Sequence, residues 1–315
     1  MKWLSAFFLS ATLLLSGLQL CIAGESSGTT AEKTPAEQDF VRLKRDENGK
    51  PAALQVAVVR YVPRDKNKDH SLEYVDLISA VHIGEHDYYK LINFLFTRYD
   101  AVLYELVAPQ GTRIPRGGNE KKGIISGAQS WMRDVLGMGM QLEDVDYTLP
   151  HLVHADLSPS EFSERMDERN ESVIGMIGKA GLAGMGRRNT TRILLSEMRL
   201  LRNLMSGNRD LALKIFMAEQ MVQSIKLGDA VEGKKGSTLV AERNKKALQV
   251  LRREIDAGKK KLAIFYGAAH MPDMYGAAHM PDMSKRLMSE FDLVPASTVW
   301  LDAWKLGPTD SQNRR

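Results

Sequence analysis

The sequence predicts an α/β fold with a mixed, largely parallel sheet that is built from both ends of the chain. Apolar, β-branched runs of strand length occur at residues 53–61, 74–82 and 101–107, and again at 261–267. A stretch with helical spacing separates the second run from the third. A long and mostly helical part, at about residues 156–258, separates the third run from the last. We therefore expect N- and C-terminal strands in one sheet, with a large helical insertion between them.

The composition is that of a folded globular chain. Hydrophobic residues make up 43% and charged residues 26% of the 315 residues, which is enough apolar material for a sizeable core. Lys and Arg number 43 against 39 Asp and Glu, and the formal charge of +4 is too even to indicate a nucleic-acid partner. Cys21 is the one cysteine, which excludes an intramolecular disulfide framework and a cysteine-based zinc site.

The N-terminus has the pattern of a secretory signal peptide. A basic residue precedes an apolar run over residues 3–15, and small residues follow near Ala23. We expect residues 1–23 to be removed and the protein to be exported, to the periplasm or outside the cell. The run is shorter than the ~20 residues of a membrane span, so no span is expected after cleavage. Lipidation of Cys21 is the less favoured alternative, because the residues before it are not small.

Between the signal segment and the first strand, the sequence predicts a disordered linker. Residues 24–50 are rich in Ser, Thr, Glu, Lys and Pro and show little periodicity. We therefore place the folded domain at residues 51–309 and treat residues 310–315 as a tail.

Local patterns predict the remaining elements in order. Apolar residues at helical spacing from Tyr88 to Leu95 indicate a helix, and a strand–helix–strand order with short joints favours parallel pairing. Ser158-Pro159-Ser160-Glu161 has the sequence of a capping box with proline at the first helical position, which predicts a helix start. After the last apolar run we expect a helix at 284–291 and a final strand near 298–301.

Nine residues are repeated in tandem. Residues 266–274 and 275–283 both read YGAAHMPDM. A single perfect repetition indicates a recent duplication, since repeat architectures need three or more units. His270 and His279 occupy the same position in the two copies and therefore compete for one role.

Three motifs are better explained without a ligand. Asp65–Asp69 resembles the start of a calcium loop but lacks the glycine at the sixth position. Gly228–Lys234 resembles a phosphate-binding loop, but Lys235 follows where Ser or Thr would hold magnesium, which favours a polar loop. His82–His86 has the H-x-x-E-H spacing of a zinc-peptidase helix, but Gly84 interrupts any helix there.

Residues that can carry chemistry stand where the predicted strands end. His82 closes the second strand, Glu105 lies within the third, and His270 follows the fourth. Ligands of open parallel sheets bind beyond the carboxyl ends of strands, and a buried ionised glutamate needs a cation or a metal. Two imidazoles and a carboxylate are a workable ligand set for a divalent metal. Taken singly, each histidine is explained as well by a structural role.

Arg243 and the pair His154 and Asp156 are further candidates. Arg243 opens the helix that leads back to the last apolar run, where it could neutralise Glu105 or stabilise a developing oxyanion. On position alone, a solvent-exposed arginine is the simpler interpretation. His154 and Asp156 precede the helix start at Ser158 and could supply a ligand or a base, or serve in capping and packing.

The order of these motifs resembles the TraB/PrgY/GumN family, which includes the Tiki proteases that inactivate Wnt. The resemblance covers roughly residues 53–305, and its specific part is that the motifs all match in order. That family is marked by two G-x-x-H motifs, a glutamate and an arginine. The segments that match are Ser79–Gly84, Tyr104–Leu106, Asp146–Ser158, Ala241–Asn244 and Tyr266–His270.

The resemblance implies an α/β core related to the erythromycin esterase and ChaN-like folds. It also implies hydrolysis that depends on Mn²⁺ or Co²⁺ in preference to Zn²⁺. Carried over by position, His82, Glu105 and His270 are the metal ligands, and Glu105 and Arg243 are the catalytic residues. Ser79 departs from the family pattern, because the first motif has glycine there.

The duplication leaves two candidates for the second motif histidine. A shift of nine residues reverses the face of a strand and turns a helix by about half a revolution, so both copies cannot occupy one site. We favour His270, which directly continues the strand at 261–267, over His279, which precedes the predicted helix. The second copy is then expected to form an extended loop over the site, or the duplication impairs activity.

Together these features predict an exported, metal-dependent hydrolase. We expect a peptidase that uses metal-activated water and acts on a peptide or a small-molecule substrate. Glu105 would be a metal ligand or general base, and Arg243 would stabilise charge at the reacting carbonyl. Two alternatives stay open: a non-catalytic protein that binds a small ligand or haem on the same scaffold, and a metal-independent, esterase-like enzyme with His82 as the base.

Overall fold

A computed structural model describes the chain over residues 39–65, 72–112, 114–117, 137–169, 209–231, 238–267 and 279–307. The expected signal peptide, the expected linker up to residue 38, His270 and the expected C-terminal tail lie outside these residues. The described residues belong to one unit of the chain, residues 34–315.

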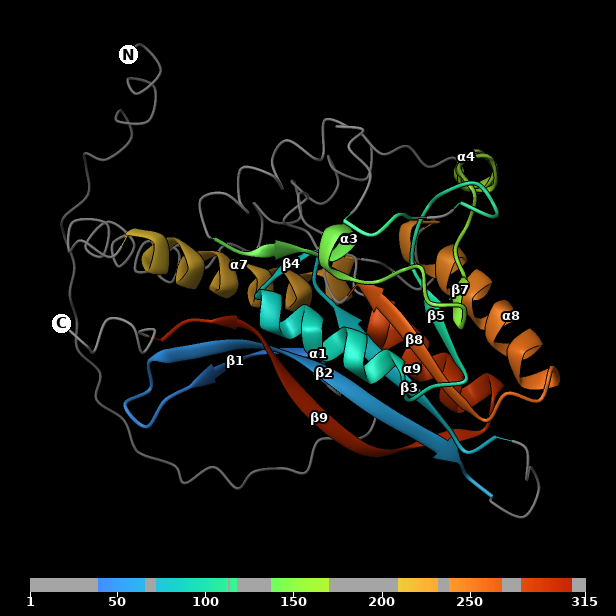
Figure 1. Cartoon of the computed structure of the whole chain (residues 1–315), viewed down its shortest axis with the longest axis horizontal. Helices are drawn as coiled ribbons and strands as arrows, with labels where there is room; N and C mark the ends of the chain where they lie inside the picture. The colour runs from blue at the N-terminus through green and yellow to red at the C-terminus, as the bar shows by residue number, and fades with distance from the viewer. Residues whose placement is uncertain are drawn as a thin grey trace, which may run out of the picture. The chain divides into compact units, whose positions relative to one another are not determined.

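A mixed sheet forms the centre of this unit (Figure 1). Its strands run in the order β1-β2-β3-β8-β5-β7, and β9 also pairs with β2. The strands β3, β8, β5 and β7 are parallel, whereas β1, β3 and β9 are each antiparallel to β2. The bounds are β1 (Val41–Arg45), β2 (Pro51–Pro63), β3 (Tyr74–Ala80), β5 (Ala101–Tyr104), β7 (Leu152–His154), β8 (Lys261–Gly267) and β9 (Leu293–Lys305).

Helices and a second, two-stranded sheet complete the described structure. The small sheet pairs β4 (Ile83–Gly84) with β6 (Gly139–Met140). None of the described helices is long and apolar enough to span a bilayer. The helices are α1 (His86–Phe96), α3 (Gln141–Asp144), α4 (Pro159–Glu168), α7 (Arg209–Val231), the π-helical turn η2 (Thr238–Glu242), α8 (Arg243–Asp256) and α9 (His279–Glu290).

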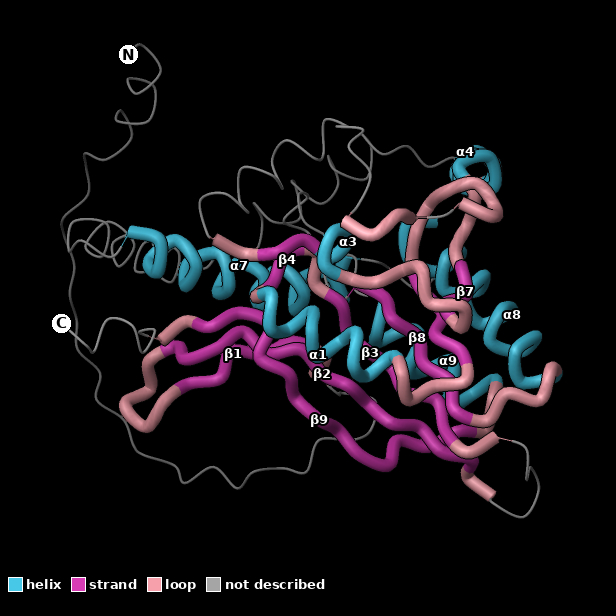
Figure 2. Tube along the Cα trace, in the orientation of Figure 1, coloured by secondary structure: helices cyan, strands magenta, loops and turns pink. Residues whose placement is uncertain are grey.

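Helices cover both faces of the sheet, and successive strand residues alternate between the two. On β2, Leu54 and Val56 belong to the apolar cluster that contains α1, while Ala57 and Val59 belong to the cluster of α8 and α9. In Figure 2, α1 crosses in front of the strands and α9 lies behind them. A strand covered on both faces must be apolar throughout, which explains the continuous hydrophobic runs in the sequence.

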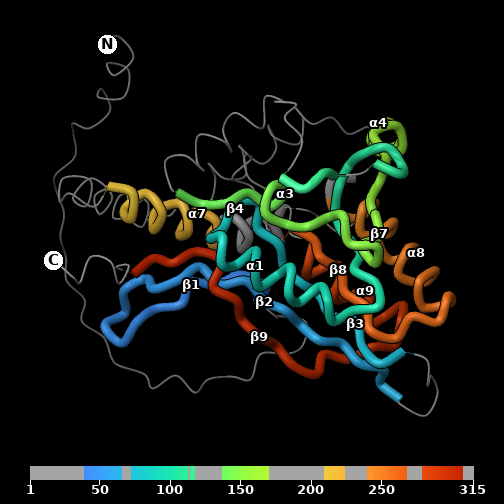
Figure 3. The backbone as a smooth tube through the Cα atoms, viewed as in Figure 1, coloured from blue at the N-terminus to red at the C-terminus, as the bar shows by residue number. Residues whose placement is uncertain are grey.

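The expected α/β class and the origin of the sheet are confirmed. The C-terminal strand β8 lies between β3 and β5, and β9 pairs with β2 along nearly the whole length of both strands (Figure 3). The strands β3 and β5, on either side of α1, are parallel but are separated by β8 instead of lying side by side. Hydrogen bonding between strands is not visible in local sequence patterns, which is why this position of β8 was not predicted.

The predicted helix start at Ser158 is also confirmed. The Ser158 hydroxyl accepts a hydrogen bond from the backbone N–H of Glu161, and the Glu161 carboxylate accepts one from the backbone N–H of Ser158. Pro159 is the first residue of α4, where its missing N–H costs nothing. Lys246 of α8 binds the same carboxylate at 2.8 Å, so this cap ties α4 to α8.

Several predicted boundaries are wrong. The linker was expected to reach residue 50, but residues 41–45 form β1, which places Val41 opposite Val56 in the sheet. The strand expected at 101–107 ends at Tyr104, so Glu105 lies just beyond its carboxyl end. Gly228, in the segment expected to be a polar loop, lies within helix α7.

Helix α9 begins five residues earlier than predicted, at His279. The second copy of the repeat was expected to be an extended loop, but its residues from His279 to Met283 form the start of α9. Met280, Met283 and Leu287 are fully buried at helical spacing against the sheet. Burial of these side chains stabilises the helical conformation where sequence position alone favours a loop.

We expect Glu161→Gln to remove an acid-sensitive part of the stability. Lys246, together with the Ser158 backbone, lowers the pKa of Glu161 to about 2. A carboxylate whose pKa is lowered on folding stabilises the folded state at pH values above its ordinary pKa of about 4.5. This contribution is lost as the pH falls toward about 2. Thermal unfolding between pH 6 and 2 should therefore show a deficit in the variant that shrinks with acid. Glu164→Gln, an exposed change on the same helix, is the matched control; a deficit independent of pH would contradict this assignment.

Candidate functional site

Polar side chains converge where the parallel strands end. Glu105 directly follows β5, Asp156 lies two residues beyond β7, and Gly267 is the last residue of β8. Because these strands are parallel neighbours, their carboxyl ends lie at one edge of the sheet, where ligands of such sheets bind. We call Glu105, Asp156, Arg243 and His279 the strand-end cluster.

Arg243 binds both carboxylates of the cluster. Its Nε donates to Asp156 Oδ1 at 2.9 Å, and its Nη2 donates to Asp156 Oδ2 and to Glu105 Oε1, each at 2.6 Å. The side chains of Arg243 and Glu105 are 6% exposed and that of Asp156 is 0% exposed. Arg243 is therefore a buried partner of Glu105, and the solvent-exposed interpretation is wrong. Burial acts to lower the pKa of Arg243, but Glu105 and Asp156 outweigh it and raise the pKa above its ordinary value.

The backbone fixes the other oxygen of Glu105. The N–H of Gly267 donates to Glu105 Oε2 at 2.6 Å, which joins the end of β8 to the residue after β5. The preceding residue, Tyr266, donates its hydroxyl to the carbonyl of Ala155 at 2.6 Å. Burial, with Asp156 nearby, raises the pKa of Tyr266 well above its ordinary value, so this hydroxyl stays protonated. The two contacts hold the ends of β5, β7 and β8 in register.

His279, from the second copy of the repeat, supplies the imidazole of the cluster. It is fully buried, and its Nε2 lies 3.6 Å from Glu105 Oε1. The ring meets Tyr266 edge to face at a centroid distance of 5.2 Å. His270, which sequence position favours for this role, lies outside the described residues. The described structure thus brings His279 to Glu105.

Asn244 orients His279 and was not among the predicted site residues. Its Oδ1 lies 2.6 Å from His279 Nδ1, and its Nδ2 donates to the carbonyl of His279 at 3.1 Å and to Asp282 Oδ2 at 2.9 Å. Asn244 is fully buried beside Arg243 at the start of α8. Its place in the segment Ala241–Asn244, which carries the predicted arginine, was the one available sequence signal.

His82 lies beyond the end of β3, on the other side of β8 from Glu105, and is half-buried. Its Nδ1 is 3.1 Å from Gln141 Oε1, and Gln141 Nε2 donates to the hydroxyl of Tyr147 at 2.9 Å. The ring of Tyr147 packs against Tyr104, the residue before Glu105. Burial, with a contribution from Glu105, raises the pKa of Tyr147. A chain of contacts through Gln141 and Tyr147 therefore links His82 to the surroundings of Glu105.

The other histidine candidates take separate positions. His154 Nε2 contacts the carbonyl of Leu106 at 2.5 Å, so of the pair His154 and Asp156 the structure brings Asp156 into the cluster. His86 is the first residue of α1 and lies 3.0 Å from Asp144 Oδ2. His82 precedes β4 and shares no helix with His86, which agrees with the rejection of an H-x-x-E-H zinc helix.

A metal site of three protein ligands is not complete among the described side chains. No group of three or more His, Cys, Asp or Glu in the described ranges is arranged to hold a metal ion. Glu105 and His279 present a carboxylate oxygen and an imidazole nitrogen to each other at 3.6 Å. Both atoms are of the type that divalent transition metals bind.

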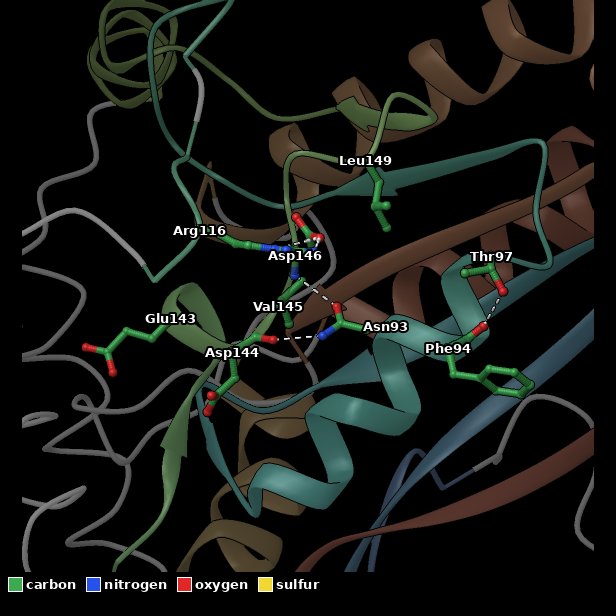
Figure 4. A pocket seen from close by; sticks show the side chains of 9 residues that line it. All are labelled: Asn93, Phe94, Thr97, Arg116, Glu143, Asp144, Val145, Asp146 and Leu149. Atoms are coloured by element: carbon green, nitrogen blue, oxygen red, sulfur yellow. Dashed lines mark hydrogen bonds and ion pairs between the residues drawn. The ribbon is translucent and has the colours of Figure 1, made fainter.

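A pocket of about 370 Å³ lies elsewhere on the molecule (Figure 4). Asn93 donates to the carbonyl of Asp144 and accepts from the N–H of Asp146, and Arg116 binds the Asp146 carboxylate. The two bonds of Asn93 join α1 to the last residue of α3 and to the segment that follows it. The residues that line it are Asn93, Phe94, Thr97, Arg116, Glu143, Asp144, Val145, Asp146 and Leu149, and none belongs to the strand-end cluster.

Comparisons of the chain with protein-family models, curated proteins and solved structures find no match. What the site can do chemically therefore follows from its own residues. The cluster combines two carboxylates, one guanidinium and one imidazole, all nearly excluded from solvent. Two buried carboxylates on one guanidinium favour a further positive charge nearby, such as a divalent metal ion.

We expect Arg243→Met to be strongly destabilising, by about 3–5 kcal/mol, because it leaves two buried carboxylates without their cation. Chemical denaturation followed by circular dichroism measures this loss. Lys245→Met is the matched control in the same turn of α8, since Lys245 is 53% exposed and pairs only with Glu242 among its described contacts. Its effect should stay below about 0.5–1 kcal/mol. Similar losses in both variants would show that Arg243 is not the electrostatic centre of the cluster.

Removal of one nine-residue copy of the repeat should leave the fold intact. Gly267 and His279 reach the two oxygens of one carboxylate, so the end of β8 and the start of α9 are close. In the shortened chain two alanines join the glycine to the single remaining histidine, and three residue steps span up to about 10 Å. A shorter connection changes the unfolding free energy by only about 1–2 kcal/mol. Deletion of either copy gives the same sequence. A shortened chain that fails to unfold cooperatively would contradict the close approach of β8 and α9.

Proposed function

We propose that the protein is an exported, metal-dependent hydrolase, a peptidase of the TraB/PrgY/GumN type, with its active site at the strand-end cluster. The single observation that supports this most is the buried Glu105 carboxylate just after the parallel strand β5, where it binds Arg243 and lies 3.6 Å from His279. The proposal includes an erythromycin-esterase or ChaN-like core, with the helices α4 to α8 as the insertion.

The ligands that we propose are Glu105, His279 and His82, with His270 as the competitor of His279. The donor chemistry of Glu105 and His279 fits a divalent ion such as Mn²⁺ or Co²⁺, and His82 stands beyond the strand on the other side of β8. When bound, such an ion supplies a water of lowered pKa and polarises the scissile carbonyl of a peptide or small-molecule substrate.

The protein's own residues prepare Glu105 for this chemistry. Arg243 and the N–H of Gly267 each donate to one of its two oxygens and fix their directions. In this state Oε1 is the atom that takes a proton from the attacking water or binds the metal. The two hydrogen bonds that Arg243 Nη2 donates at 2.6 Å both go to carboxylates. This supports the role of neutralising Glu105 more than the role of stabilising an oxyanion.

Metal content and peptide cleavage test the proposal together. Purified protein should contain Mn, Co or Zn by mass spectrometry and should cleave a peptide library in a manner that chelation abolishes. Glu105→Gln and His279→Ala should each lower bound metal at least about tenfold and cleavage at least about a hundredfold. His151→Ala is the matched histidine control, because His151 contacts the carbonyl of Phe96 away from the cluster.

Three outcomes would separate the alternatives. Unchanged metal content in His82→Ala and Glu105→Gln would contradict the metal site. Cleavage that persists after chelation would favour metal-independent, esterase-like hydrolysis with a histidine base. A greater loss in His270→Ala than in His279→Ala would return the role to the first copy of the repeat.

A further inference from the structure

We infer that two buried side-chain amides, Gln141 and Asn244, are positioning residues that fix His82 and His279 in one tautomer. In this tautomer Nδ1 carries the proton and Nε2 carries the lone pair. The inference deepens the proposed function, because it names the residues that would prepare both imidazoles of that site. It concerns the protein without metal and can therefore be tested separately.

The amide of Asn244 cannot be reversed. Its Nδ2 donates to the backbone carbonyl of His279 and to the carboxylate of Asp282, and both of these groups are acceptors only. Asp282 is itself held by Arg286 Nε at 2.8 Å. The Oδ1 of Asn244 must therefore face His279 Nδ1 at 2.6 Å, and this nitrogen must donate.

Gln141 makes the corresponding contact with His82. Gln141 is buried, and its Nε2 donates to the hydroxyl of Tyr147 at 2.9 Å. In this orientation its Oε1 lies 3.1 Å from His82 Nδ1 and accepts the proton of that nitrogen. Because the Tyr147 hydroxyl can donate as well as accept, the tautomer of His82 follows from this orientation of the amide and is less tightly fixed than that of His279. An amide of a different element, α3 in place of α8, thus makes the same contact with the second histidine.

The shared tautomer has a chemical consequence. A histidine that donates through one ring nitrogen to a fixed acceptor presents the other nitrogen as a ligand or base, in a set direction. For His279 that other nitrogen is Nε2, which lies on the side of Glu105 Oε1. An amide acceptor sets the orientation without adding a further negative charge to a cluster that already holds two carboxylates.

The side-chain contacts that Asn244 makes on α9 all lie within the second copy of the repeat, residues 275–283. Asn244 bonds a histidine and the aspartate three residues later, His279 and Asp282, both in the second copy of the repeat. Residues 270–273 carry the same His-Met-Pro-Asp sequence. A single copy therefore contains every side chain that Asn244 contacts on α9.

Nitrogen NMR of the metal-free protein tests the inference directly. Long-range ¹⁵N–¹H spectra of ¹⁵N-histidine-labelled protein at a pH of about 8, above the ordinary pKa of imidazole, distinguish the two tautomers from each other and from the doubly protonated ring. The protein has 7 histidines, and His82→Ala and His279→Ala assign the two signals. We expect the Nδ1–H pattern for both. An Nε2–H pattern at either residue would overturn the inference for that residue.

Paired variants show whether the amides are responsible. Asn244→Leu should convert His279 to a mixture of tautomers and leave His82 unchanged, and Gln141→Leu should do the reverse. Gln141→Glu keeps an acceptor oxygen for His82. Asn244→Asp keeps one for His279 but turns its second oxygen toward Asp282, so it is combined with Asp282→Asn, which restores a donor there. Both should retain the Nδ1–H pattern, which also covers a leucine variant that fails to fold. An unchanged pattern in both folded leucine variants would overturn the positioning role.

A metal titration keeps this test distinct from that of the proposed function. If the wild-type protein binds Co²⁺ or Zn²⁺, Asn244→Leu should weaken the affinity about 10–100-fold, and the double variant Asn244→Asp with Asp282→Asn much less. If the wild-type protein binds neither Co²⁺, Zn²⁺ nor Mn²⁺, the proposed metal chemistry is wrong, while the tautomers measured without metal still decide the role of the two amides.

Discussion

One guanidinium shared by two buried carboxylates is the interaction on which the site depends. Arg243 joins Glu105, after β5, to Asp156, after β7, and it does so from the first residue of α8. Separately, each of these charges would cost several kcal/mol to bury. Together they fix three chain segments at one point, and they place a carboxylate oxygen beside an imidazole in a nearly dry environment.

The first residues of α8 also hold His279 and the cap of α4, in addition to this ion pair. Arg243 points to the ends of the strands, and the next residue, Asn244, points to the start of α9. Two adjacent residues on one helix therefore align a carboxylate and a histidine that come from distant parts of the chain. Lys246, two residues further on, holds the cap of α4 through Glu161. The position of α8 is thus fixed by polar contacts on several sides as well as by its apolar face.

Local sequence patterns predicted most of the helices and strands, but they did not predict which strands are adjacent in the sheet. The strands and the capping box at Ser158 follow from patterns of hydrophobicity and capping residues over a few positions. The pairing of Arg243 with Glu105 was only one of the options for Arg243, because its position alone favoured a solvent-exposed side chain. The insertion of β8 between β3 and β5 depends on hydrogen bonds between residues far apart in the chain, so no local pattern shows it. Residues 41–45 have the charged composition of a linker and become a strand because an open edge of β2 is available to them.

The two copies of the repeat cannot be told apart from their own sequence. Identical residues have identical propensities, so nothing within the nine residues distinguishes His270 from His279. What distinguishes them is the sequence that follows the second copy. Ser284 bonds the hydroxyl of Tyr61, and Leu287 is buried against the sheet, so the helix that contains these residues carries His279 with it. Gln141 was missed for a related reason, since its importance comes from the histidine and tyrosine beside it.

The place of β8 in the sheet has a consequence for how the chain can fold. Its neighbours β3 and β5 are made early in synthesis, but the strand that must pair with both ends at Gly267. Until that residue is available, the two halves of the parallel sheet have no common strand, and the Glu105 carboxylate lacks the N–H that fixes it. Contacts of such long sequence separation make folding slow and leave the core incomplete until nearly the whole chain is present. A growing chain of this kind exposes apolar strand surface for most of its synthesis, and the strand-end cluster is among the last parts to form.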